Sequence, residues 1–210
     1  PSKGTMFLAG EPYAPNGPGA AMALGINMIH QEIHLLPDLS VAENVFLGHL
    51  PTRDGMIDRK AMHRETEKQL RRLGLDISPQ TPVRQLKIAA QQLVEIARAL
   101  TLNSRLLILD EPTAALGKDE TDLLFKQIEE LKKEGVSFIY ISHRMDEIAR
   151  IADKVVVMRD GHLIARHDSG SADVSVLVSQ MVGRPIERLF PELPLPGDAE
   201  VLRVEQLSDK

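Results

Sequence analysis

Two short apolar runs in the middle of the chain constrain its fold more than any other feature. Residues 106–109 form a continuous apolar segment that ends in two acidic residues, and residues 136–141 form a mostly apolar segment followed by a Ser-His pair. Runs of this length are too short for helices and are typical of strands buried on both faces of a sheet. An amphipathic helix predicted over 118–134 separates them, so the two strands are expected to lie parallel in one sheet.

The rest of the chain continues this alternation of strands and helices. Apolar residues at i, i+3, i+4 and i+7 predict a helix over 89–102, and Ser40 with Glu43 forms the capping box that starts a helix over 41–47. The other predicted elements are a strand and turn within 1–15, helices over 18–24, 59–73, 144–152 and 172–181, and strands over 26–29, 155–158 and 163–164. The alternation indicates an α/β fold with a parallel sheet at its centre.

Composition excludes several classes of function. The 210 residues are 43% hydrophobic and 26% charged, which suits a soluble globular domain rather than a disordered chain. With 25 basic and 30 acidic side chains the net charge is −5, the wrong sign for a general nucleic-acid binder. The absence of cysteine excludes disulfides and thiolate zinc sites and fits a reducing cytoplasm. No apolar run approaches the ~18 residues that a membrane span needs.

Polar side chains with phosphate chemistry follow three of the predicted strands. Asp110 stands where a carboxylate can hold Mg²⁺ beside nucleotide phosphates, and Glu111 is placed to orient an attacking water. His143 ends the neighbouring strand, where an imidazole can contact a γ-phosphate, and Gln31 follows a further strand. Each has a plainer interpretation, as a helix cap for the acidic pair or a structural hydrogen-bonding group for the histidine, but the combination favours phosphate chemistry.

Four segments in this order resemble the motifs of ABC-type ATPases. Leu106–Thr113 is similar to the Walker B segment with its catalytic glutamate, and Ile139–Arg144 to the switch-histidine segment. Ile29–Glu32 resembles the Q-loop in the form used by sugar importers, and Leu86–Leu100 stands where the signature motif and its helix belong. The resemblance covers nearly the whole chain, and short sequence segments within it are similar to the monosaccharide-importer branch of the family. It implies an incomplete ABC-type ATPase core of P-loop NTPase type, with a helical subdomain over about 32–100.

The resemblance also implies a role for each motif residue. Catalysis would fall to Glu111 and His143, and Mg²⁺ would be held by Asp110 and Gln31. The residues expected to bind ATP are Gln31, Lys87, Ala89, Gln91 and Asp110. In this family two cassettes enclose two ATP molecules, and each signature segment completes the site of the opposite cassette.

The sequence departs from the family pattern at three places. No segment of the form G-x-x-x-x-G-K-[ST] occurs, so the backbone cradle and lysine of the P-loop (Walker A) are absent. Lys87 stands where the signature usually has serine, and Gly117 where the D-loop commonly has a polar side chain. In the family the P-loop lies just before the point that corresponds to Pro1, so the chain is expected to be a piece cut after its phosphate cradle. Positioning and electrostatics supply nearly all of phosphoryl-transfer catalysis, so negligible hydrolysis by this chain alone is expected.

The resemblance predicts the organisation and setting of the intact protein. Residues 1–183 would form the first cassette, 184–199 a Pro-rich linker, and 200–210 the start of a second cassette. Its partners would be the transmembrane permease of a sugar importer, a second ATP-binding cassette and, indirectly, a periplasmic or extracellular sugar-binding protein, with no nucleic acid. The protein would lie peripherally on the cytoplasmic face of the bacterial inner membrane.

Two other functions compete with energy coupling for sugar import. An ABC-type ATPase of DNA repair or translation would need basic surfaces or long coiled coils, which the net charge and the absence of long heptads disfavour. A non-catalytic ABC-like regulatory module is the other alternative, and the retained Glu111 and His143 argue against it. An open sheet face is also expected, because the first strand and P-loop helix are missing, and with it a tendency to associate.

Overall fold

The computed structural model describes residues 4–168, 173–183, 203 and 205. The chain divides into two compact units, Pro1–Ala152 and Asp153–Lys210. The predicted linker at 184–199 lies outside the described residues, as does the predicted second-cassette segment at 200–210 apart from Arg203 and Glu205. The predicted boundary at residue 183 stays a prediction.

A three-stranded parallel sheet forms the centre of the first unit, as the alternating pattern predicts. Its strands are β3 (Ile26–Ile29), β6 (Leu106–Asp110) and β7 (Ser137–Ile141), in the order β3-β6-β7. Leu109 lies between Ile29 and Tyr140 in the register of the sheet. The carboxyl ends of the three strands therefore lie side by side at one edge, which brings their following loops together.

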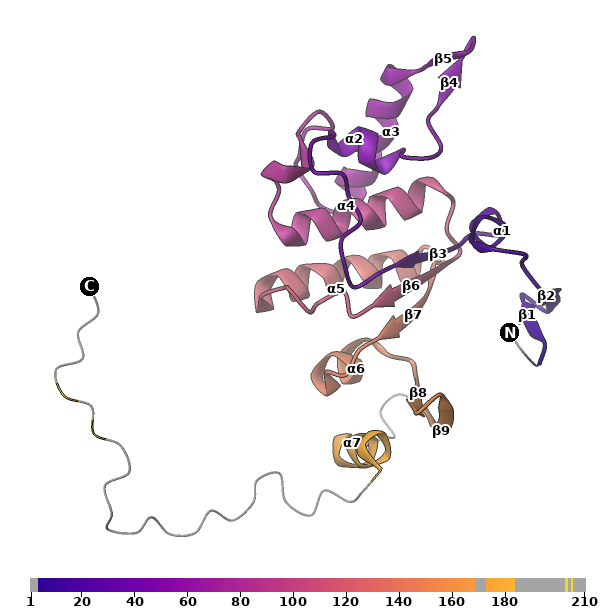
Figure 1. Cartoon of the computed structure of the whole chain (residues 1–210), viewed down its shortest axis with the longest axis vertical. Helices are drawn as coiled ribbons and strands as arrows, with labels where there is room; N and C mark the ends of the chain where they lie inside the picture. Colours follow the sequence, from indigo (N-terminus) through magenta and orange to yellow (C-terminus); the bar gives the residue numbers. More distant parts are fainter. Residues whose placement is uncertain (1–3, 169–172, 184–202, 204, 206–210) are drawn as a thin grey trace. The chain divides into compact units, whose positions relative to one another are not determined.

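Helices and hairpins complete the first unit (Figure 1). The helices are α1 (Pro18–Ala23), α2 (Val41–Val45), α3 (Arg59–Arg72), the 3₁₀ helix η1 (Val83–Gln85), α4 (Ile88–Thr101), α5 (Lys118–Lys133) and α6 (Met145–Ile151). The hairpins are β1 (Met6–Leu8) with β2 (Glu11–Tyr13), and β4 (Thr52–Arg53) with β5 (Met56–Ile57). Helix α4 contacts α2 and α3 on one side and β3 on the other, so it joins the helical part to the sheet.

Local signals in the sequence explain where these elements begin and end. Pro18 occupies the first turn of α1, and Gly25 follows its end with a φ of 80°. The predicted capping box is present at α2, where the Ser40 hydroxyl accepts from the Glu43 backbone and the Glu43 carboxylate accepts from the Ser40 backbone. The Asp58 side chain caps α3 by accepting from the backbone N–H of Ala61.

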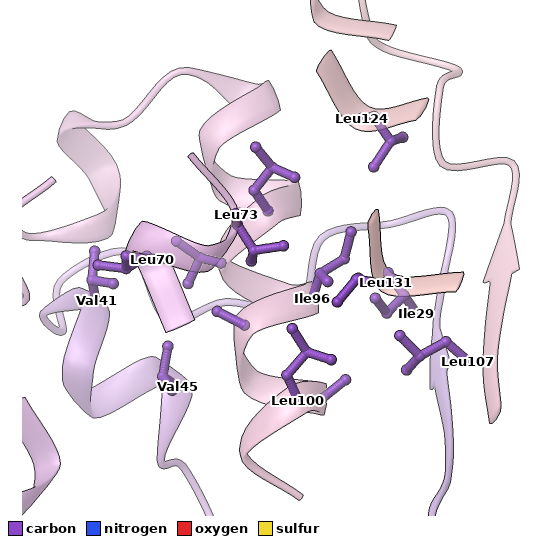
Figure 2. Close-up of a cluster of buried hydrophobic side chains, with 14 of the residues drawn as sticks. Ile29, Val41, Val45, Leu70, Leu73, Ile96, Leu100, Leu107, Leu124 and Leu131 are labelled. Carbon is purple, nitrogen blue, oxygen red and sulfur yellow. The ribbon is translucent and has the colours of Figure 1, made fainter. Parts of the chain in front are cut away.

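One continuous hydrophobic core joins the sheet to the helices (Figure 2). Leu107 and Leu109 on β6 are fully buried and belong to the same cluster as side chains of α4 and α5. Figure 2 shows Leu107, Leu131 of α5 and Ile29 of β3 close together. Leu107 and Leu109 alternate with more exposed residues along β6, as Phe138 and Tyr140 do along β7, so one face of the sheet packs against this core.

The other face of the sheet is partly open, which corrects the expectation that the strand after residue 136 is buried on both faces. Met28 is 43% exposed on β3, and Ile139 and Ile141 are 47% and 43% exposed on β7. The register places Met28, Ile108 and Ile139 in one row across the sheet. Strand β7 thus packs against the core on one face only, through the partly buried Phe138 and Tyr140, and the predicted open apolar face is present in the described part of the chain.

The second unit holds a hairpin and a helix. Strands β8 (Lys154–Arg159) and β9 (His162–Asp168) pair antiparallel around the predicted Asp-Gly turn, and α7 (Val174–Val182) contacts both strands. The His167 ring hydrogen-bonds the Gln180 side chain at 2.8 Å. Among the described residues of both units, no helix is long and apolar enough to cross a membrane.

Candidate active site

The turn after β6 places Glu111 at the carboxyl edge of the sheet in an unusual backbone conformation. Glu111 has a φ of 44°, in the left-handed region that non-glycine residues rarely occupy. Its N–H donates to the carbonyl oxygen of Ile141 on β7 at 2.9 Å, which extends the β6–β7 pairing by one hydrogen bond. Strained conformations of this kind persist where surrounding structure holds them, and they gather at functional sites.

His143 meets Glu111 across the ends of the two strands, as the sequence predicts. Its Nδ1 lies 2.8 Å from Glu111 Oε1, and the side chains are 68% and 29% exposed respectively. A carboxylate only accepts hydrogen bonds, so the ring donates through Nδ1–H. A neutral ring bound in this way carries its lone pair on Nε2, and only a doubly protonated ring can donate to Glu111 and to a second acceptor together.

Asp110 and Gln31 follow neighbouring strands of the same sheet. Asp110 closes β6 and is partly exposed, and Gln31 lies exposed two residues beyond the end of β3. Among the described residues, no hydrogen bond or ion pair engages the Asp110 carboxylate. One free carboxylate and one amide oxygen fit Mg²⁺, which keeps several waters and takes its remaining ligands from phosphates. In the described part of the chain, no cluster of three or more histidine or acidic side chains forms a self-sufficient metal site.

The signature residues lie apart from this edge. Lys87 caps α4 with no side-chain cap bond, and Ala89 is partly buried in the first turn of the same helix. Gln91 donates through Nε2 to the carbonyl of Leu86 at 2.9 Å, which fixes the loop before α4. Among the described residues, no hydrogen bond or ion pair links these three side chains to Glu111 or His143. Their role in binding nucleotide stays a prediction.

The sequence analysis missed Glu147, a buried carboxylate on α6 that contacts residues close to Glu111 and His143 in the chain. Glu147 is 1% exposed and accepts from Thr113 Oγ1 at 2.7 Å, Tyr140 OH at 2.8 Å and Ser142 Oγ at 3.0 Å. Arg144 Nη1 forms an ion pair with it at 2.8 Å. Its position in the first turn of a helix directly after the histidine was the available signal, but acidic residues there are common for reasons of helix dipole alone.

The Glu147 network also alters the chemistry of Tyr140. Burial raises the pKa of the Tyr140 hydroxyl well above its usual value, and the Glu147 carboxylate raises it further. The hydroxyl therefore stays protonated at all ordinary pH values and acts as a permanent donor to Glu147.

A second buried carboxylate, Glu95 on α4, lies behind the Q-loop segment. Glu95 is 9% exposed, and its Oε1 accepts from the backbone N–H of His34 at 2.8 Å. Its Oε2 is buried without a hydrogen-bond partner in the described residues. Burial raises the pKa of Glu95, against the opposing effects of His34, Arg98 and His30. Glu95 thus connects the segment after Gln31 to the helix that begins at the signature.

Comparison with known proteins agrees with these motifs. The profile of the ABC transporter family matches residues 1–114. The ribose import ATP-binding protein RbsA of Rhodopirellula baltica is 47% identical over 209 residues, 99% of this chain and 41% of that protein. The ribose import ATP-binding protein RbsA 3 of Rubrobacter xylanophilus is 46% identical over 208 residues, 99% of this chain and 42% of that protein. The chain therefore spans about two fifths of the length of these relatives.

Solved structures show the same fold. A nucleotide-free ATP-binding cassette from an ABC transporter superposes with a TM-score of 0.70 at 22% identity, covering 87% of this chain and 74% of that one. The cbiO1 protein of Clostridium perfringens, part of the ABC transporter complex cbiONQ, has a TM-score of 0.68 at 26% identity and covers 80% of this chain and 67% of that one. The fold, the ordered motifs and the family profile agree, and the chain belongs to the ABC transporter family of ATP-binding proteins.

Proposed function

We propose that this chain supplies the residues that hydrolyse ATP in an ATPase that powers import of a monosaccharide through an ABC transporter. The observation that carries the proposal is the Glu111–His143 contact of 2.8 Å at the ends of two adjacent parallel strands. The names of the relatives support the substrate class, because both are ribose import ATP-binding proteins. Permease subunits and a second cassette are the partners that such an assignment requires.

The geometry supports a division of labour between the two side chains. Glu111 orients the attacking water and accepts its proton, while a bond forms from the water oxygen to the γ-phosphorus and the bridging P–O bond to ADP breaks. His143 donates through Nε2 to the γ-phosphate when its ring is doubly protonated, and Glu111 stabilises that charged ring through Nδ1–H. Asp110 and Gln31 would hold Mg²⁺, whose charge neutralises the phosphate oxygens.

The phosphate-binding loop of such an ATPase is missing from the 210 residues. The 210 residues contain no G-x-x-x-x-G-K-[ST] segment, so they lack the lysine and backbone N–H groups that hold β- and γ-phosphates. We expect titration of Mg-ATP into this chain in a calorimeter to give no heat up to millimolar nucleotide. Micromolar binding that is lost in His143→Ala would show a phosphate site of a different kind and would contradict this part of the proposal.

A chimera tests the catalytic assignment. This chain would replace the 209 matched residues of the Rhodopirellula baltica relative, so that the remaining parts of that protein are supplied by the relative. We expect the chimera to hydrolyse ATP, and Glu111→Gln to slow the step at this site by about 100-fold or more while nucleotide binding persists. Glu11→Gln, an exposed glutamate on β2, is the matched control.

Two results would contradict the proposal. Hydrolysis that is equal in Glu111→Gln and in the Glu11→Gln control would remove Glu111 from the reaction. A folded chimera that binds Mg-ATP but never hydrolyses it would favour a non-catalytic role for this segment.

A further inference from the structure

Glu147 is placed to hold both halves of the Glu111–His143 pair. The carboxylate is almost fully buried at 1% exposure, yet it is surrounded by donors rather than left alone. Thr113 lies two residues after Glu111, and Ser142 and Arg144 flank His143 on either side. One side chain of α6 thus accepts hydrogen bonds from the turn after β6 and from the loop after β7.

The donors divide between the two carboxylate oxygens in a way that couples the loops. Oε1 accepts from Thr113 at 2.7 Å and forms an ion pair with Arg144 Nη1 at 2.8 Å. Oε2 accepts from Tyr140 and from Ser142, at 2.8 Å and 3.0 Å. Hydrogen bonds to a buried carboxylate are short and strong, and removing the carboxylate leaves three hydroxyl donors and the Arg144 guanidinium to find new partners. A shift in either loop therefore costs hydrogen bonds on the carboxylate that the other loop also uses.

The strained turn at Glu111 needs such support. Its φ of 44° is unfavourable for a residue with a side chain, and two backbone hydrogen bonds hold it, from its N–H to Ile141 at 2.9 Å and from the Ala114 N–H to its carbonyl oxygen at 3.1 Å. The hydrogen bond from Thr113 to Glu147 ties the residues that follow Glu111 in this turn to helix α6. Without it, the turn has less to oppose relaxation to an ordinary conformation, and the Glu111 carboxylate would move away from His143.

We propose that Glu147 is the positioning residue that sets the distance between Glu111 and His143. It contacts neither water nor phosphate in this role, since its carboxylate is enclosed by Thr113, Tyr140, Ser142 and Arg144. The meaning of the pair for hydrolysis rests on the proposed function, whereas the positioning itself is a property of the nucleotide-free chain. The two can therefore fail separately.

The test follows the His143 ring directly by NMR. In the ¹⁵N-labelled chain, the ring nitrogens are assigned by their loss in His143→Gln, and Glu111→Gln gives the spectrum of a ring without its carboxylate partner. We expect Glu147→Gln to move the His143 nitrogen signals by at least half of the displacement that Glu111→Gln produces. Glu95→Gln is the matched control, because Glu95 is also a buried glutamate of the first unit but bonds His34 instead.

Unchanged His143 signals in a folded Glu147→Gln chain would overturn the proposal. Thr113→Val supplies a second test if that variant does not fold, because valine keeps the shape of threonine and removes the hydroxyl that bonds Glu147 from the Glu111 turn and also interacts with Tyr140. A folded Thr113→Val chain with wild-type His143 signals would overturn it equally. In the chimera, Glu147→Gln is expected to lower kcat by about 10- to 100-fold with KM unchanged, the pattern of misplaced catalytic groups. A chimera without any hydrolysis would contradict the proposed function and leave the NMR result standing.

Discussion

At the scale of single residues, two buried glutamates of the first unit show that a hydrogen-bond environment decides whether a buried charge is stabilised. Glu147 and Glu95 are similarly inaccessible, at 1% and 9% exposure. Three hydroxyl donors and the Arg144 guanidinium surround the first, whereas the second has one backbone donor and an Oε2 atom without a partner in the described residues. The charge on Glu95 is therefore a liability to stability, and that of Glu147 is compensated.

Glu95→Gln is expected to stabilise the chain at neutral pH. Because burial raises the pKa of Glu95, the folded state binds a proton more readily than the unfolded state. The contribution of Glu95 to stability is then fully present below its unfolded pKa of about 4.5 and is lost as the pH rises through its folded pKa. Glutamine can still accept from the His34 N–H and carries no charge, so we expect a gain of about 1 kcal/mol at pH 7.5 that disappears toward pH 4. Urea unfolding at both pH values measures it, and the exposed Glu11→Gln serves as control. A Glu95→Gln chain that is less stable than wild type at pH 7.5 would contradict the expectation.

Residue-level patterns predicted that Glu111 and His143 lie at one edge of the sheet but did not predict the Glu147 contacts beside them. Glu111 follows β6 directly and His143 lies two residues beyond the end of β7, so the rule that strand ends meet at one edge was sufficient to bring them together. Glu147 lies on the next helix and acts through contacts with four side chains, which depend on how α6 packs against β7. No periodicity or spacing in the sequence encodes that packing. The same holds for Glu95, whose burial follows from the arrangement of α4 against the Q-loop segment.

At the scale of secondary-structure elements, capping residues and terminal glycines predicted accurately where the helices begin and end. They did not predict how the elements pack against one another. Predicted helices at 89–102 and 118–134 correspond to α4 (Ile88–Thr101) and α5 (Lys118–Lys133). Strand β7 was predicted correctly as an element, but its exposure was wrong because an apolar run does not reveal whether both of its faces are covered. The local sequence determines whether a segment forms a helix or a strand, whereas the elements packed around it determine how deeply it is buried.

The capping box of α2 gives a prediction at this scale. Val41, Ala42 and Val45 of this five-residue helix are 0% exposed, so a short helix carries a dense part of the core. Ser40→Ala removes the hydroxyl that accepts from the Glu43 N–H, and we expect a loss of about 1 kcal/mol in the free energy of unfolding at pH 7. The hydrogen bond from that hydroxyl is also the main cause that lowers the pKa of Glu43. The capping interaction is therefore present above the unfolded pKa of about 4.5 and is lost as the pH falls through the lower folded pKa.

Urea unfolding of wild type and Ser40→Ala between pH 7 and pH 3 checks both parts of this prediction. The difference between the two chains should shrink at the acidic end. Ser175→Ala, in an exposed position of α7, is the control for a serine substitution without a capping role. If the difference in free energy of unfolding between the two chains stayed constant over the whole pH range, the capping interaction would not depend on the ionisation of Glu43.

At the scale of the whole molecule, the open face of the central sheet is the feature from which we predict how the chain behaves in solution. Parallel sheets in globular proteins normally have both faces covered, and here one face carries Met28, Ile139 and Ile141, each of which is more than two fifths exposed. Strand β7 pairs only with β6 among the described strands, so it also offers an unpaired edge beside this face. Apolar surface next to a free strand edge favours self-association.

We therefore expect this chain to associate as its concentration rises, with a melting temperature that depends on concentration. Replacing Met28 and Ile139 by threonine keeps residues suited to strands and makes the open row more polar, because the two side chains lie in one row across the sheet. Sedimentation velocity over a wide concentration range should show the double variant shifted toward monomer relative to wild type. The control is Met56→Thr, at a methionine that is 73% exposed on the β5 hairpin strand, away from the sheet. If Met56→Thr reduced association as much as the double variant, general surface hydrophobicity would be the cause. A wild-type chain that stays monomeric and melts cooperatively at every concentration would mean that the open face is too small to drive association.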